Sequence, residues 1–178
     1  TKAGGGRSVD FPNFFVKQYE YFHYIELCKM LRKNAIGLKA RGVGFSEIAA
    51  AILVNGYTTR PHFRGVVAAQ QEGYVDDTLS KCWMQLSYLD DNTEDGMRKL
   101  RQVHNTAKWK RASSKNVDGV ESGWMSEIEG ITADKPNKIR GDRTDLLIYD
   151  ESGSWPNWKK AFIQGAALVH FLGRRFGI

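Results

Sequence analysis

The sequence predicts an α/β fold in which helices flank a central, mainly parallel sheet. Three observations lead to this prediction. Apolar, strand-like runs alternate with segments of helical periodicity along the chain. A glycine-containing loop follows the first strand-like run, and two adjacent carboxylates follow a later one. A strand, loop and helix followed by a second, acidic strand is typical of a nucleotide-binding fold.

Hydrophobic periodicity and breaker residues define the elements of the first half. Aromatic side chains recur at helical spacing over residues 11–32, which predicts a helix with an apolar stripe. The sequence then predicts a strand over 35–38, a helix over 46–54, a strand over 64–69 and a helix over 76–89. Asp76 or Asp77 is the expected cap of the last of these helices.

The second half continues the alternation with less regular segments. Patterning predicts a strand within 98–111, a short strand over 123–131, a loop or short helix over 136–141, a strand over 146–149, a helix over 157–169 and a strand that starts at 175. The clearest cationic cluster consists of Lys108, Lys110, Arg111 and Lys115. This cluster fits the solvated face of a hairpin, and the alternative is a contact with DNA.

Composition indicates one well-buried domain over residues 11–178, preceded by a flexible tail over 1–10. Of the 178 residues 42% are hydrophobic, and no apolar run is long enough to cross a membrane or to form the core of a signal peptide. We therefore expect a protein that is not secreted, with Cys28 and Cys82 as reduced core thiols. The four histidines are scattered, which argues against a zinc site, and the net charge of +6 suits a nucleic-acid partner.

The glycine-containing loop resembles a phosphate loop in which the lysine is displaced. When Gly44 and Ser46 are aligned with the end of the usual pattern Gly-x-x-x-x-Gly-Lys-Ser/Thr, Phe45 takes the place of the lysine. Lys39 then stands at the position of the first glycine. The β- and γ-phosphates still need a cation, which Lys39 can supply by folding across the loop. Arg41 is the second candidate.

Two glycines and the start of a helix complete the expected phosphate site. Gly42 and Gly44 permit positive φ, so that successive N–H groups converge on phosphate oxygens next to a helix N-terminus. Ser46 Oγ is the expected Mg²⁺ ligand. In many motor ATPases a glutamine upstream of the loop reads the adenine edge; Gln18 fits that role, and the alternative is an ordinary exposed glutamine. The expected nucleotide-binding residues are Gln18, Lys39, Ala40, Arg41, Gly42, Val43, Gly44, Phe45 and Ser46.

A buried strand that ends in two acids supplies a metal ligand and a base. Residues 146–149 form a continuous apolar run, as expected of a central parallel strand buried on both faces. Asp150 would hold Mg²⁺, directly or through water, and Glu151 would orient and polarise the attacking water. An acidic turn after a strand is common by itself. Its occurrence together with the loop, each after an apolar strand, favours Mg²⁺-dependent hydrolysis of a nucleoside triphosphate.

Together these segments resemble the ATPase domain of large terminase subunits, the DNA-packaging motors of tailed bacteriophages. Some terminases carry this displaced-lysine loop, ending in glycine, an aromatic residue and serine. The segments Gly130-Ile-Thr-Ala, Lys138-Ile-Arg-Gly-Asp-Arg143 and Glu151-Ser-Gly-Ser-Trp-Pro also fit, so that the resemblance spans residues 11–178. It implies a RecA-like ASCE P-loop NTPase that binds ATP and Mg²⁺.

The resemblance also implies partners and residue roles. The family acts as a homo-oligomeric ring, usually a pentamer, that works with the portal protein and the small terminase subunit on double-stranded DNA. Such a ring is expected in the host cytoplasm, transiently docked on the procapsid. The residues that carry over to the loop and to catalysis are Lys39, Arg41, Ser46, Asp150 and Glu151. Arg140 lies in a segment that supplies an arginine finger in some terminases; Arg143 is the alternative, and both also fit surface cations.

Two parts of the family lie outside this sequence, and two other functions stay open. The coupling motif should follow the strand at 176–178, and the nuclease domain that makes the full-length protein an endonuclease is absent. A helicase-like P-loop translocase would share both carboxylates but usually keeps the Gly-Lys-Ser/Thr ending. A nucleotide-binding module without turnover is favoured by Phe45 in place of lysine and disfavoured by the intact Asp150 and Glu151.

Overall fold

The computed structural model describes residues 13–38, 42–93, 104–105, 110–132, 144–160 and 169–177, with backbone alone for 104–105, 110–117, 121 and 169–177. The helices of this part are α1 (Val16–Met30), α2 (Phe45–Thr59) and α3 (Glu72–Asn92), and a 3₁₀ turn covers Ser152–Ser154. The strands are β1 (Ala35–Ile36), β2 (Arg64–Ala69), β3 (His104–Asn105), β4 (Lys110–Val117), β5 (Val120–Thr132), β6 (Thr144–Tyr149) and β7 (Val169–Gly177).

These strands form one sheet in the order β1-β7-β6-β2-β5-β4-β3. The pairs β1–β7, β7–β6, β6–β2 and β2–β5 are parallel, and the pairs β5–β4 and β4–β3 are antiparallel. The predicted mainly parallel sheet is therefore confirmed. β7 lies between β1, which leads into the glycine loop, and β6, which leads into the two carboxylates. This extra strand between the two is the arrangement expected of an ASCE P-loop fold.

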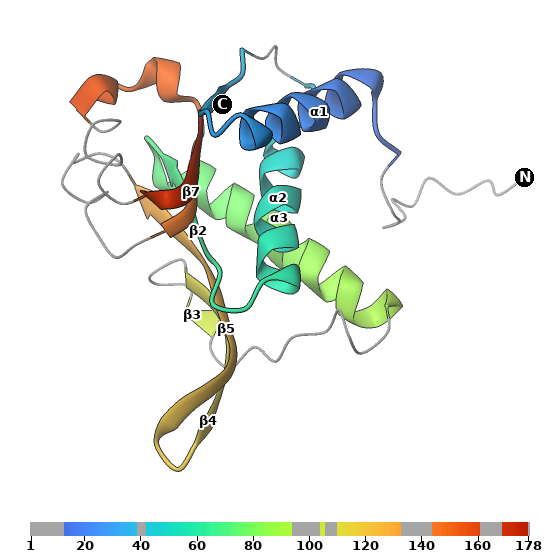
Figure 1. Cartoon of the computed structure of the whole chain (residues 1–178), viewed down its shortest axis with the longest axis vertical. Helices are drawn as coiled ribbons and strands as arrows, with labels where there is room; N and C mark the ends of the chain where they lie inside the picture. The colour runs from blue at the N-terminus through green and yellow to red at the C-terminus, as the bar shows by residue number, and fades with distance from the viewer. Residues whose placement is uncertain are drawn as a thin grey trace, which may run out of the picture.

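The helices cover one face of the sheet and leave a smaller apolar cluster on the other. α2 and α3 pack against each other and against β2, and α1 lies across the N-terminal end of α2 (Figure 1). Side chains of β6 alternate between the two faces, because Leu146 and Ile148 belong to the large core while Leu147 and Tyr149 join a second cluster with Val66. The prediction that this strand is buried on both faces is thus confirmed.

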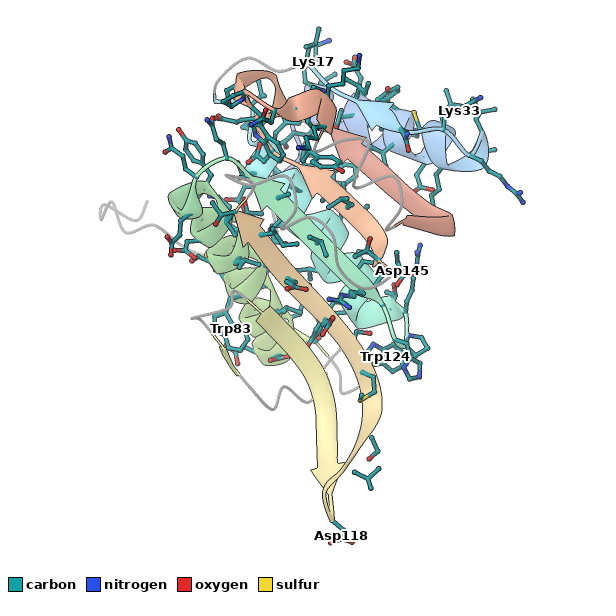
Figure 2. The ribbon with its side chains drawn as sticks, turned by 90° about the vertical axis from the view of Figure 1, so that its left-hand side faces the viewer. Lys17, Lys33, Trp83, Asp118, Trp124 and Asp145 are labelled. Carbon is teal, nitrogen blue, oxygen red and sulfur yellow. The ribbon has the colours of Figure 1, made fainter. Side chains whose placement is uncertain are left out.

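The β4–β5 hairpin extends away from the helices (Figure 1). Figure 2 shows Asp118 at its tip. Asp118 and Gly119 have φ of +53° and +81°, as a tight turn of type I′ requires. The predicted short strand over 123–131 is longer than expected, since β5 pairs with β4 as far as this turn. Lys110, Arg111 and Lys115 lie on β4, so the described part of the cationic segment belongs to a hairpin, as the sequence predicts. Lys108 lies outside the described residues, and both the solvated face and the contact with DNA stay predictions.

Several element boundaries differ from expectation. The helix expected over 76–89 begins at Glu72 with Gln71 as its cap, so the prediction of an Asp76 or Asp77 cap is wrong. The helix thus starts about one turn before Asp76, and its buried stripe already includes Val75, the residue directly before Asp76. The helix expected to begin at 46 starts at Phe45 and continues to Thr59.

The last strand begins earlier than predicted. β7 starts at Val169 rather than at 175, and of the helix expected over 157–169 the structure describes residues 158–160. Two arginines interrupt the apolar pattern there, although both lie in register with β6. The segment 136–141 lies outside the described residues.

The remaining expectations concern the cysteines and the membrane. Cys28 and Cys82 are both buried and unbridged, which confirms them as core thiols. Among the described helices, none combines the length and apolar content that crossing a membrane requires.

Candidate nucleotide-binding site

The glycine loop ends in a left-handed turn at the start of α2. Gly42 and Gly44 have φ of +82° and +72°, so both adopt the conformation that their lack of Cβ permits. Gly44 is the residue before α2, and no side chain caps the helix there. The N–H groups of a first helical turn have no partner within the helix, and they carry its positive dipole end. The loop therefore presents donors suited to a phosphate.

Phe45, which occupies the position of the usual phosphate-loop lysine, has a packing role in the fold. Its ring packs edge-to-face on Tyr21 of α1, with centroids 4.5 Å apart, and it joins the edge of the large core. Position 45 thus fixes α2 against α1. A cation for phosphates would therefore have to come from another position, as the sequence predicts. Lys39, Ala40 and Arg41 lie outside the described residues, so their assignment to the phosphates stays a prediction.

The Gln18 amide connects the start of α1 with the loop. Its Oε1 accepts a hydrogen bond from the Phe15 N–H at 3.0 Å, and its Nε2 donates to the Val43 carbonyl at 3.2 Å. A Cβ on Gly44 would lie 2.6 Å from this Nε2. Gln18 is only 8% exposed, so the alternative of an ordinary exposed glutamine is wrong. The sequence placed Gln18 near the nucleotide; the structure places it beneath the loop that would hold the phosphates.

Asp150 follows β6 directly and is held by its backbone on two sides. Its N–H donates to the Ala68 carbonyl at 2.9 Å, and its carbonyl accepts from Trp155 Nε1 at 3.1 Å. Trp155 in turn packs edge-to-face on Tyr149 and Trp158. The side chain of Asp150 is 5% exposed. A carboxylate this buried needs a cation or donors to offset its desolvation, which suits a metal ligand.

Glu151 adopts a conformation that is unusual for its residue type. Its φ of +50° lies in the left-handed region, which costs a non-glycine residue roughly 1–2 kcal/mol. The turn is secured by Ser154, whose N–H and Oγ both lie within hydrogen-bond distance of the Glu151 carbonyl, at 3.0 and 2.8 Å. Strain of this kind concentrates at functional sites, where the surroundings hold a side chain in one direction.

Sequence reasoning missed Gln70 and Trp155. Ser154 Oγ lies 3.3 Å from Gln70 Oε1, so the residue after β2 meets the acidic turn after β6. The available signal was a polar residue directly after a buried strand. Trp155 was noticed only as part of the family motif, whereas the structure makes its indole N–H a donor to the Asp150 carbonyl.

The two parts of the site lie at the same edge of the sheet. β1, β7 and β6 are parallel, so the loop after β1 and the acids after β6 both follow carboxyl ends. The described residues contain no group of three or more histidine, cysteine, aspartate or glutamate side chains that could hold a metal. Such a cluster is not required for Mg²⁺, which usually takes one or two protein ligands and completes its shell with phosphate and water. Ser46 lies in the first turn of α2 and Asp150 directly after β6, and their assignment to Mg²⁺ stays a prediction.

An open cavity of about 450 Å³ adjoins the loop on its α1 side. It is lined by Lys17, Glu20, Tyr21, Tyr24, Ile36, Gly37, Leu38, Val43 and Phe45. Burial raises the pKa of Tyr21 to about 12, so its hydroxyl stays protonated at physiological pH, and the charged residues of the lining, Lys17 and Glu20, form an ion pair at 2.8 Å. A second cavity of about 370 Å³ includes Asp145 at the start of β6, the opposite strand end from the two acids. Figure 2 shows how far Asp145 lies from Lys17. Arg140 and Arg143 lie outside the described residues.

The fold is similar to solved large terminases. The large terminase ATPase domain of Thermus phage P74-26 matches with a TM-score of 0.56 and 19% identity, over 81% of this chain and 57% of that chain. The HK97 bacteriophage large terminase matches with a TM-score of 0.67 and 13% identity, over 94% and 33%. The large terminase of a thermophilic bacteriophage, solved in complex with ADP, matches with a TM-score of 0.65 and 11% identity, over 93% and 38%.

At these identities the likeness establishes the fold. The chain has the P-loop fold of terminase ATPase domains, as the sequence predicts, and it spans 57% of the P74-26 structure and less of the other two. No family model and no curated protein matches the sequence.

Proposed function

We propose that this chain is the ATPase domain of a phage large terminase subunit, which binds ATP with Mg²⁺ and hydrolyses it to ADP and phosphate. One observation carries the proposal. A left-handed glycine loop that opens α2 lies at the same sheet edge as Asp150 and the strained Glu151, with an additional strand between them. The likeness to terminase ATPase domains supports it, and one of those terminases was solved with ADP.

The residues divide the chemistry between them. The N–H groups of the loop and of the first turn of α2 would bind the phosphates, with Lys39 or Arg41 as the cation. Ser46 and Asp150 would hold Mg²⁺, which neutralises charge on the phosphates. Glu151 would polarise the water that attacks the γ-phosphate, and its fixed left-handed backbone limits the directions in which its carboxylate can point.

The nucleobase fits the cavity on the α1 side of the loop. Tyr21, Tyr24 and Phe45 supply flat apolar surface there, and Gln18 lies beneath the adjoining loop. This arrangement supports the adenine role of Gln18, because Gln18 contacts the loop that lines the cavity. Its amide already bonds two backbone groups, so the base would share Nε2, which has a second hydrogen to donate.

Assembly and DNA movement belong to the same proposal. Arg140, or Arg143, would enter the site of a neighbouring subunit in a ring, so that hydrolysis depends on assembly. The ring, a pentamer by family resemblance, would act with the portal protein and the small terminase subunit to move double-stranded DNA into the procapsid in the host cytoplasm. The net charge of +6 is compatible with a DNA partner. In the full-length protein a nuclease domain would cut the packaged DNA.

One observation favours a second function, a nucleotide-binding module without turnover. The position that carries the phosphate-loop lysine in the usual pattern is occupied by Phe45, whose ring is committed to packing on Tyr21. A helicase-like translocase has no comparable support, because it would be expected to keep that lysine.

Substitution of Glu151 separates an ATPase from a binding module. In Glu151→Gln we expect kcat for Mg-ATP to fall by about 10²- to 10⁴-fold, because the general base is lost while the shape is kept. ATP affinity should stay within about twofold, since the phosphate contacts are untouched. Glu72→Gln, which alters an acid in the first turn of α3, is the matched control and should behave as wild type. Wild-type binding of ATP without any turnover would reject the ATPase and leave the binding module.

A further inference from the structure

Three side chains of α1 contact successive parts of the phosphate-loop segment. Gln18, Tyr21 and Tyr24 are spaced three residues apart, so they follow one another along one side of the helix. Together we name them the α1 clamp. Tyr24 contacts the strand before the loop, and Gln18 contacts the last residues of the loop. An element outside the sheet therefore holds both ends of the segment that would bind phosphate.

Tyr24 completes the hydrogen bonding of the strand that leads into the loop. Its hydroxyl donates to the Ile36 carbonyl at 3.2 Å and accepts from the Ile36 N–H at 3.1 Å. Ile36 belongs to β1, which is the edge strand of the sheet that the described residues form and pairs there with β7. Backbone groups on an open strand edge need other partners. The Tyr24 hydroxyl takes the place of a neighbouring strand for Ile36.

Tyr21 fills the space between the two ends of the loop segment. Its ring stands so close to Gly37 that a Cβ there would lie 2.8 Å from a ring carbon. The same ring packs edge-to-face on Phe45, with centroids 4.5 Å apart. Tyr21 is 7% exposed, so it has little room to move. The distance between Gly37 and Phe45 is thus set by one buried aromatic side chain.

We propose that Tyr24 is a positioning residue of the nucleotide site and anchors the α1 clamp, which holds the described ends of the phosphate-loop segment, Ile36 and Val43, in place before nucleotide arrives. The proposal rests on the proposed function in that the ligand of the loop is taken to be a nucleotide. Loop ends that are fixed in advance lose their conformational entropy on folding rather than on binding, so affinity falls when the anchor is removed. Tyr24 contacts neither Asp150 nor Glu151 among its described hydrogen bonds, so the chemical step should be spared.

Removal of the Tyr24 hydroxyl tests the anchor, with a matched control on the same helix. Tyr24→Phe keeps the ring and deletes both bonds to Ile36. Tyr19→Phe deletes a hydroxyl from a side chain that is 59% exposed and whose ring contacts His23. Two measurements are made on wild type and both variants: amide hydrogen exchange at Ile36, resolved by NMR, and affinity for Mg-ADP by calorimetry. Steady-state ATP hydrolysis then separates KM from kcat.

In Tyr24→Phe we expect the Ile36 amide to exchange faster and Mg-ADP affinity to fall by about five- to tenfold, the change expected from the loss of about one net hydrogen bond. KM for ATP should rise in step, and kcat should stay within about twofold. Tyr19→Phe should match wild type throughout.

Unchanged exchange at Ile36 would overturn the anchor. Faster exchange with Mg-ADP affinity equal to that of Tyr19→Phe would overturn the positioning role. The exchange measurement needs no nucleotide, so it still decides the anchor in a chain that binds no Mg-ADP, an outcome that rejects the proposed function instead.

Discussion

The phosphate loop and the acidic turn lie at the same edge of the sheet but are held in different ways. The acidic turn is fixed mainly from within the sheet and its own sequence: Asp150 bonds the backbone of β2, and Trp155, five residues later, bonds Asp150. The loop is held by α1, whose contacts with it come from Gln18, Tyr21 and Tyr24. The two carboxylates are therefore built into the sheet, whereas the position of the loop depends on where α1 packs.

Because of this difference, the acidic turn should stay fixed while the phosphate loop can shift with α1. Strand-end residues bonded to a neighbouring strand are displaced only if the sheet opens. A loop fastened by a helix responds to shifts of that helix. Changes on the loop side should thus appear mainly in nucleotide affinity, and changes on the acidic side mainly in kcat.

On the loop side, the largest effect is expected at Gly44, where the loop meets α2. Gly44→Ala places a Cβ at φ +72° and 2.6 Å from Gln18 Nε2, so it adds backbone strain and displaces the Gln18 contact with Val43. We expect a loss of about 1–2 kcal/mol in the free energy of unfolding and a fall of more than about tenfold in Mg-ADP affinity. Denaturant unfolding and calorimetry measure the two effects.

Gly73→Ala is the matched control for Gly44. Gly73 lies in the first turn of α3, and a Cβ there would meet nothing within 4 Å. Since alanine favours helix over glycine, this variant should be about 0.5–1 kcal/mol more stable with unchanged affinity. Equal behaviour of the two alanine variants would show that the loop does not need a left-handed Gly44.

A smaller effect, on the acidic side, is expected from Trp155→Phe. The ring is kept, but the Asp150 carbonyl loses its donor at 3.1 Å. A catalytic turn displaced by a fraction of an ångström should lower kcat by about threefold to tenfold, with Mg-ADP affinity within about twofold. Trp158→Phe, in the same aromatic cluster, leaves that bond intact and serves as control. A loss of affinity without a loss of kcat in Trp155→Phe would contradict the division between the two regions.

The sequence was sufficient to predict the parts of the site that depend on local pattern. The apolar run of β6 and the glycines of the loop each carry their own signal, because burial on two faces and positive φ restrict residue type. The run over 64–69 coincides with β2 for the same reason. The glutamine upstream of the loop was also identified, although its bonds to the loop were not.

What the sequence did not predict depends on tertiary packing or on weak patterns. The α1 clamp joins residues 12 and 25 positions apart, and these contacts exist only because α1 crosses the start of α2. Gln70 meets Ser154 through the neighbouring positions of β2 and β6 in the sheet. β7 was predicted too short because its two arginines interrupt the apolar pattern of the strand. Its pairing with β6 shows that both arginines belong to the strand.

The central claim is that the phosphate loop and the acidic turn form one site, and its most direct test is whether the loop and Asp150 share one metal ion. The affinity of a non-hydrolysable ATP analogue is measured with and without Mg²⁺ in wild type and in Asp150→Asn, which keeps the shape of the side chain and removes its charge. The account predicts that Mg²⁺ tightens binding in wild type by about tenfold or more, and that Asp150→Asn loses most of this gain while its Mg²⁺-free affinity is unchanged. A gain from Mg²⁺ that is the same in both proteins would contradict it, because the acidic turn and the phosphate loop would then not form one site.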